Sequence, residues 1–153
     1  LKSGEIGQMN SWMFRRGCID ALPKWVTDMP LDKSLAFYFA EFGDWGYINK
    51  VMSLYRIHPG GTYSPASQRH QTELLLAQAV TLLQVPAYNS RYGDRIRMNI
   101  CHYCRELAHW HRGNNPGRQL WYLLAYFRHA PSKWSALKVI LAEDLFSSRE
   151  RER

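Results

Sequence analysis

Long apolar runs are missing from this sequence, and cysteines are few. A membrane-spanning helix needs roughly 18–20 consecutive apolar residues, whereas the longest apolar runs here, 35–42 and 74–83, are short or interrupted. The first residues lack the charged segment, apolar stretch and cleavage site of a signal peptide. Three cysteines are too few, and odd in number, for a disulfide scaffold. We therefore expect a protein of the reducing cytoplasm that at most lies on a membrane surface.

Nucleotide-binding motifs are also missing. The chain contains no Gly-x-Gly-x-x-Gly, no P-loop and no Asp-x-Asp. Acidic residues are in the minority, since 13 Asp and Glu stand against 20 Lys and Arg and give a formal charge of +7. That balance permits contact with phosphates, anionic lipid or nucleic acid but singles out none of them. Apolar residues make up 46% of the chain, which is enough to bury a core.

The first part of the chain, residues 1–64, has the pattern of short mixed elements. Asp32 and Gly43 stand at the two ends of a helical apolar pattern, where an N-cap and a C′ glycine belong. Later, β-branched and aromatic residues alternate as they do in a strand. The expected elements are a strand at 11–15, a helical turn at 18–22, a helix at 33–42 and a strand at 51–57.

The second part, residues 65–147, has the pattern of four consecutive helices, and a basic tail follows at 148–153. Pro86, then residues 113–115, then residues 131–132 separate the helices as breakers. The expected helices cover 67–85, 91–112, 116–128 and 133–146. Their apolar stripes are expected at Leu75, Ala79, Leu82 and Leu83, at Leu120, Leu123, Leu124 and Phe127, and at Leu137, Ile140, Leu141 and Leu145.

Arg56 and His58 are the residues with the most distinctive chemistry. Alternation along the expected strand 51–57 puts them side by side on one face, just before a glycine turn. A guanidinium can grip phosphate oxygens with two hydrogen bonds, and a neutral imidazole can bind a divalent metal. The pair therefore suits a metal-bound diphosphate. The alternative is that both side chains make structural hydrogen bonds at a strand end.

A series of short motifs runs through residues 9–64. They are Ser11, Phe14-Arg15-Arg16, Leu22-Pro23, Trp25, Asp32, Ala40 with Gly43, Tyr47-Ile48, Val51-Met52-Ser53 and Tyr55-Arg56-Ile57-His58-Pro59-Gly60-Gly61. In order and spacing this series resembles the C-terminal half of the catalytic domain in bacterial family 2 glycosyltransferases, which have the GT-A fold. The helical remainder resembles the variable extension that follows that domain. The resemblance implies an α+β fragment that is mostly α, made of the C-terminal portion of a GT-A α/β domain and a helical extension of about four helices.

The resemblance also implies roles for three residues. Asp32 matches the catalytic base, which takes a proton from the acceptor hydroxyl as it attacks the anomeric carbon. His58 matches a histidine that helps hold a divalent metal, Mn²⁺ or Mg²⁺, against the donor diphosphate, and Arg56 would lie near those phosphates. Leu31 and Lys33 depart from the residues that often flank the base. Asp32 as a mere helix N-cap therefore remains the alternative for that residue.

The implied protein is an inverting glycosyltransferase that moves a sugar from a nucleotide-sugar donor to a hydroxyl of a saccharide or lipid-linked acceptor of the cell envelope. In that family an α/β half ending in Asp-x-Asp comes first and holds the metal. We therefore expect this chain to be a C-terminal piece that is inactive alone and binds no cofactor alone. It would lie in the cytoplasm or peripherally at the inner face of the membrane. The alternative is a non-enzymatic helical adaptor that binds protein or nucleic acid through residues 65–147.

Cys101, Cys104 and His111 share one face of an expected helix, while His109 points away from it. A zinc site usually places its Cys-x-x-Cys pair on a turn, so we expect buried core cysteines here instead.

Basic and aromatic residues alternate over 91–112. A solvated helix with its aromatics in the core is expected there rather than a nucleic-acid face. Contact of this face with anionic lipid is a second possibility. A further aromatic group is expected to pack between helices rather than to form a platform for sugars. Its members are Trp121, Tyr122, Tyr126, Phe127 and Trp134.

Overall fold

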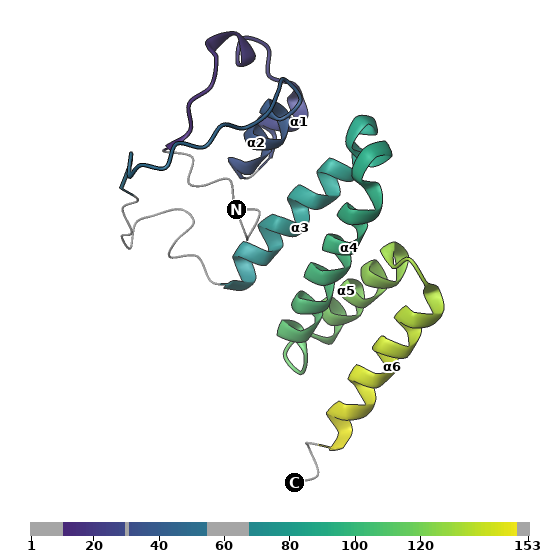
Figure 1. Cartoon of the computed structure of the whole chain (residues 1–153). Helices are drawn as coiled ribbons and strands as arrows, with labels where there is room; N and C mark the ends of the chain where they lie inside the picture. The colour runs from purple at the N-terminus through teal and green to yellow at the C-terminus, as the bar shows by residue number, and fades with distance from the viewer. Residues whose placement is uncertain (1–10, 30, 55–67, 150–153) are drawn as a thin grey trace. The chain divides into compact units, whose positions relative to one another are not determined.

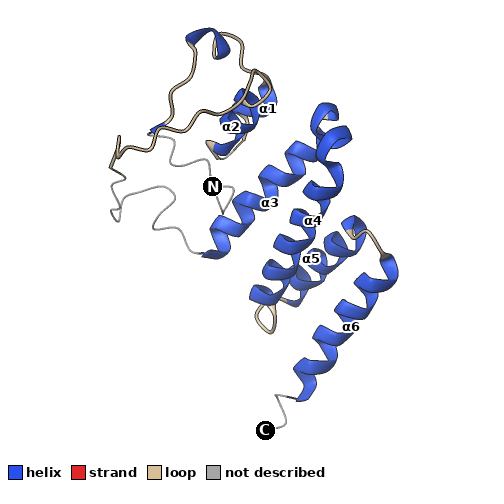
Figure 2. Cartoon of the chain, in the orientation of Figure 1, coloured by secondary structure: helices blue, strands red, loops and turns tan. Residues whose placement is uncertain are grey.

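The computed structural model describes residues 11–29, 31–54 and 68–149 (Figure 1). The chain divides into two compact units, Leu1–Ser67 and Gln68–Arg153. Figure 2 shows helices and loops but no strand over the described residues. The expectation of a mostly helical chain is confirmed. The finer expectation, a GT-A α/β portion, is not supported, because the described residues contain no strand.

The expected strand at 11–15 is wrong, and the described part of the second expected strand, residues 51–54, has no regular structure either. Residues 55–57 lie outside the described part of the chain. A strand needs a neighbour that pairs with its N–H and C=O groups, and no described segment offers one. Side chains hold the first segment instead, because the Phe14 ring stacks on Phe39 with centroids 4.6 Å apart.

The N-terminal unit contains a 3-10 turn, η2 (Arg16–Cys18), and two short helices, α1 (Lys24–Thr27) and α2 (Lys33–Phe39). η2 replaces the helical turn expected at 18–22. The helix expected at 33–42 ends early, with Ala40 as its C-cap, so Gly43 is not its C′ residue. The N–H groups of Glu41 and Phe42 bond to the carbonyls three residues earlier, so the chain after α2 forms a tighter turn of the 3-10 type.

The C-terminal unit is built from the four expected helices. They are α3 (Gln68–Gln84), α4 (Pro86–His111), α5 (Pro116–His129) and α6 (Lys133–Arg149). Contacts run in chain order: α3 packs on α4, α4 on α5, and α5 on α6 (Figure 1). Ile100, Cys104 and Leu107 of α4 are the most buried large side chains, so the core is centred on α4. None of the helices in the described residues is long and apolar enough to cross a membrane.

Two of the helix starts show how local chemistry fixed the boundaries. Asn115 accepts a hydrogen bond from the Arg118 N–H at 3.0 Å, and Pro116 follows it at the first helical position, a usual N-cap arrangement. Pro86 was expected to break the chain, but it is the first residue of α4, so the expected start at 91 is wrong. Proline is tolerated there because the first N–H groups of a helix have no partner within the helix.

Lys133 joins the start of α6 to the end of α5. Its ammonium group donates to the carbonyls of Phe127 and Arg128, each at 2.7 Å, and to that of Ala130 at 3.3 Å. The last carbonyls of a helix carry partial negative charge and lack partners within the helix. A single cation therefore satisfies the α5 C-terminus and fixes the α5–α6 turn.

Candidate functional site

Asp32 lies at the start of α2, on the wall of a shallow hollow of about 240 Å³ in the N-terminal unit. The other lining residues come from α1, α2 and the loops beside them. They are Leu22, Val26, Thr27, Met29, Leu31, Ser34 and Leu35. Asp32 carries the only formal charge among these described lining residues.

Ser34 fixes the backbone next to Asp32. Its side chain is buried, and its Oγ lies 2.9 Å from the Leu31 carbonyl oxygen and 3.3 Å from that of Val26. Because a hydroxyl has one proton, it donates to one of these carbonyls at a time. Both contacts hold the first turn of α2, and the second reaches across to α1. The segment that carries Asp32 is thus anchored by a buried polar group.

The carboxylate of Asp32 does not cap α2. Asp32 occupies the N-cap position, but its backbone is already helical, with φ −59° and ψ −22°, and its side chain makes no capping hydrogen bond. A capping residue normally has an extended backbone that aims its side chain at the N–H groups of the first turn. The N-cap interpretation is therefore wrong for the side chain, and Asp32 is exposed to solvent.

Arg56 and His58 lie outside the described residues. Their expected position beside Asp32 therefore stays a prediction. Within residues 11–29, 31–54 and 68–149 no group of three or more His, Cys, Asp or Glu side chains could hold a metal ion. The described residues alone thus supply no ligand set for the divalent metal that the resemblance implies.

Cys101, Cys104 and His111 lie on one buried face of α4, as their spacing predicts. Cys101 donates a weak hydrogen bond to the Tyr126 carbonyl oxygen at 3.7 Å, and the His111 ring stacks on Tyr122 with centroids 5.7 Å apart. Burial, and secondarily the neighbouring Cys101, raises the pKa of Cys104 to about 12. Cys101 and Cys104 are both buried free thiols, so the prediction of core cysteines is confirmed.

Because of the Cys104 thiol, we expect the free energy of unfolding of the helical unit to fall as the pH becomes alkaline. In the unfolded chain the thiol ionises near a pKa of 9.0, whereas in the folded chain its pKa is about 12. Between these values the unfolded state has lost a proton that the folded state keeps, so the free energy of unfolding falls by about 1.4 kcal/mol per pH unit. We expect a loss of roughly 2–3 kcal/mol near pH ~11. Urea unfolding followed by far-ultraviolet circular dichroism measures it.

Cys104→Ala is the matched control for this pH dependence. The variant leaves a small cavity, so at neutral pH it should be about 1 kcal/mol less stable than the wild type. Because the variant has no thiol to ionise, this difference should shrink with rising pH and then reverse. Tyr122 titrates in both proteins; burial and then the Glu73 carboxylate raise its pKa most, and Cys104 adds a smaller increase that the variant loses. Parallel pH curves for the two proteins would contradict the burial of this thiol.

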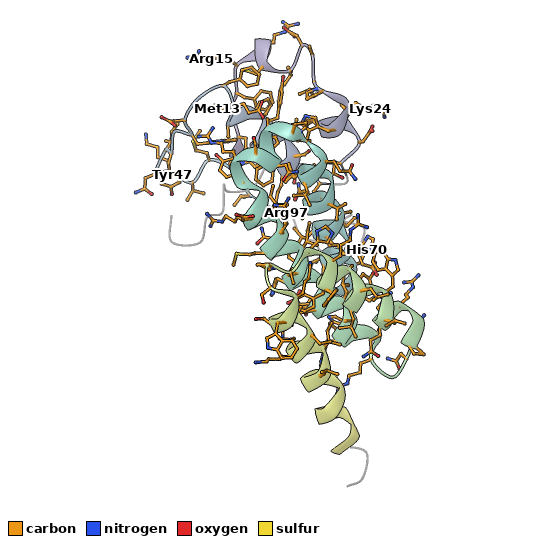
Figure 3. The ribbon with its side chains drawn as sticks, turned by 90° about the vertical axis from the view of Figure 1, so that its right-hand side faces the viewer. Met13, Arg15, Lys24, Tyr47, His70 and Arg97 are labelled. Atoms are coloured by element: carbon orange, nitrogen blue, oxygen red, sulfur yellow. The ribbon has the colours of Figure 1, made fainter. Side chains whose placement is uncertain are left out.

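Several polar side chains at the start of α4 interact within the helix itself. Arg97, labelled in Figure 3, donates to Asn89 Oδ1 at 3.1 Å and pairs with Asp94 at 3.4 Å. The Arg91 guanidinium lies 5.3 Å from the centroid of the Tyr92 ring. A recess of about 360 Å³ beside them is lined by residues 89–95 alone. A ligand site is normally enclosed by several elements, and this recess has walls from one helix.

The outer faces of α5 and α6 differ from the sequence expectation. Tyr122 and Tyr126 are buried, as expected, but Trp121 is 60% exposed and Trp134 is 67% exposed. Part of the expected apolar stripes is exposed as well. The exposed residues are Leu120, Trp121 and Leu124 on α5 and Trp134, Leu137 and Leu141 on α6. Each helix has more apolar residues than its packing face can bury. This excess of apolar residues is the feature of the sequence that could have indicated an exposed apolar surface.

Comparisons of this chain with protein-family models, with curated proteins and with solved structures found no match. A proposal about its function therefore depends on the residues themselves and on the motif resemblance of residues 9–64.

Proposed function

We propose that this chain is the C-terminal part of an inverting glycosyltransferase and that Asp32 is its catalytic base. The supporting observation is the environment of Asp32. Asp32 is exposed, makes no capping bond and lines a largely apolar hollow beside an anchored turn. The motif series of residues 9–64 supplies the reaction class. The proposed location is the cytoplasm, at the inner face of the membrane.

Asp32 acts on the acceptor in this proposal. A sugar hydroxyl is a poor nucleophile, and a carboxylate within hydrogen-bond reach accepts its proton as the oxygen attacks the anomeric carbon. The new carbon–oxygen bond forms on the face opposite the departing nucleoside diphosphate, which leaves with the electron pair of the broken bond. The configuration at the anomeric carbon is therefore inverted.

The donor would be bound by residues outside the described part of the chain. Arg56 is proposed to pair with the diphosphate, and His58 to supply one ligand to Mn²⁺ or Mg²⁺, which stabilises charge on the leaving group. One imidazole does not hold a catalytic metal alone, because affinity depends on a full ligand set. The family's remaining ligands belong to an Asp-x-Asp motif that this sequence does not contain. We therefore expect no tight donor binding by these residues alone.

Calorimetric titration with UDP- and GDP-sugars tests this proposal. One sample is the 153-residue chain, and the other is the chain extended by whatever coding sequence precedes it in the gene. We expect heat of binding only from the extended chain, and only with Mn²⁺ or Mg²⁺ present. Turnover is then followed as release of nucleoside diphosphate in the presence of a saccharide or lipid-linked acceptor.

Two results would overturn the proposal. One is tight nucleotide-sugar binding by the chain alone, and the other is preceding coding sequence without an Asp-x-Asp. A salt-dependent gel shift of DNA or RNA by the chain would instead favour a helical adaptor that binds nucleic acid.

A further inference from the structure

One face of α6 is apolar and uncovered. Ala136 is 1% exposed on the side where α6 packs against α5, whereas Trp134, Leu137 and Leu141 are 67%, 39% and 51% exposed. These three residues are spaced three and four positions apart, so they form one stripe along the helix. We call them the α6 stripe. α6 lies at the edge of its unit, beside α5 (Figure 1).

A second apolar group lies on α5. Leu120, Trp121 and Leu124 are each about 60% exposed, at spacings that place them on neighbouring positions of one helical face. We call them the α5 patch. Tyr122, Leu123 and Tyr126 occupy the opposite side and are buried. Adjacent helices thus each expose a tryptophan flanked by leucines.

The sequence around these residues is mostly basic, and Glu143 and Asp144 follow Leu141 on α6. The sequence has no Asp or Glu between Glu106 and Glu143, but it has Arg112, Arg118, Arg128, Lys133 and Lys138 in that interval. Lys133 is held by the carbonyls at the end of α5. Lys138 lies on the α6 stripe itself, with its ammonium nitrogen 5.5 Å from the centroid of the Trp134 ring. Arg118 and Arg128 are exposed on α5.

We propose that the α6 stripe and the α5 patch dock on the surface of an anionic lipid bilayer. This inference deepens the peripheral membrane location in the proposed function, and it assigns that location to particular residues. Tryptophan favours the boundary between headgroups and acyl chains, because one edge of its ring is polar and the rest is apolar. Leucines at helical spacing insert into the acyl boundary, and the polar face of such a helix is typically rich in Lys and Arg.

Charge complementarity favours a lipid surface over other occupants. Each Lys or Arg near an anionic leaflet is attracted by its negative surface charge. A second copy of this chain would carry the same positive charge and would be repelled at close approach. A nucleic acid would also be attracted by the positive charge. The four exposed leucines, however, would gain nothing from contact with phosphates or base edges; they are Leu120, Leu124, Leu137 and Leu141. An anionic bilayer has an apolar interior and a negative surface. It therefore matches both the exposed apolar residues and the positive charge of the α6 stripe and the α5 patch.

Vesicle flotation with the 153-residue chain tests the proposal, and it needs neither donor nor acceptor. We compare vesicles of phosphatidylcholine alone with vesicles that also contain phosphatidylglycerol. We expect binding to the mixed vesicles, and we expect it to weaken as salt screens the charges. Leu137→Gln combined with Leu141→Gln should lower the partition coefficient about tenfold or more. Lys138→Glu should act in the same direction.

Met98→Gln and Arg95→Glu are the matched controls, since both residues are exposed on α4, which carries neither of the two apolar groups. Neither should change vesicle binding by more than about twofold. Equal binding to both kinds of vesicle, or unchanged binding by the Leu137→Gln, Leu141→Gln protein, would overturn the proposal. So would a dimer in sedimentation that these substitutions dissociate while vesicles remain unbound. A failed transferase assay with intact vesicle binding would refute the catalytic proposal alone.

Discussion

Under the proposed function, changing Asp32 to asparagine in the chain extended by its preceding coding sequence is expected to lower the kcat of sugar transfer by about 10²–10⁴-fold, the usual contribution of a positioned general base. The amide keeps the size and shape of the side chain but cannot accept the proton of the acceptor hydroxyl. Donor binding does not use Asp32, so the KM for the nucleotide-sugar should change little. Initial rates of nucleoside diphosphate release, measured across donor and acceptor concentrations, separate the two parameters.

The substitution also separates catalysis from helix capping. Asparagine caps a helix about as well as aspartate does, so a residue needed only at the N-cap would tolerate the change. Asp28→Asn is the matched control, because Asp28 is an exposed carboxylate in the same unit, paired with Lys24 at the end of α1. Surface ion pairs of this kind contribute about 0–1 kcal/mol to stability. Full turnover by the Asp32→Asn enzyme would remove Asp32 from the mechanism.

Leu107→Ala is expected to destabilise the helical unit by about 3–5 kcal/mol, near the upper end of the range for buried leucines. Leu107 is 0% exposed in the central helix α4, close in sequence to the fully buried Cys104. Alanine leaves a cavity that packed neighbours fill only in part. Domains are stable by only about 5–15 kcal/mol, so the loss is a large fraction of the total. Urea unfolding followed by far-ultraviolet circular dichroism provides the measurement.

Leu124→Ala is the control for Leu107→Ala, because it deletes the same atoms from a side chain that is 60% exposed on α5. Its expected cost is below about 1 kcal/mol, since little apolar surface returns to water and no cavity forms. Similar losses for the two variants would mean that α4 is not the centre of the core.

The helices could be predicted from the sequence better than their faces could. Breakers and apolar spacing gave four helices in the right order, because these signals are local. Pro86 was misassigned, since proline both ends a helix and begins one, and only the neighbouring packing decides. Leu120 and Leu124 were misassigned for a related reason: periodicity identifies an apolar band but not how much of it a neighbour covers. α6, with α5 as its main packing partner, leaves part of that band exposed.

The N-terminal unit could be predicted less well. An extended segment becomes a strand only when another strand pairs with it, so residue alternation alone could not decide the state of residues 11–15 or 51–54. The position of Asp32 before a helix was predicted correctly, but its role as a cap was not, because capping depends on the backbone angles of that one residue. Arg56 and His58 stay predictions, since both lie outside the described residues.

The contact of Lys133 with the end of α5 makes the orientation of α6 sensitive to one positive charge. Acetylation of that lysine would neutralise the ammonium group and leave a single N–H, so most of its bonds to the α5 carbonyls would be lost. The bonds of Lys133 lie at the α5–α6 turn and not inside the core formed by α3, α4 and α5. We therefore expect that core to remain folded. A helix with one main neighbour is also the segment that opens at the lowest free energy. An acyl group on a single side chain would thus loosen the turn at residues 131–132 without unfolding the rest of the unit.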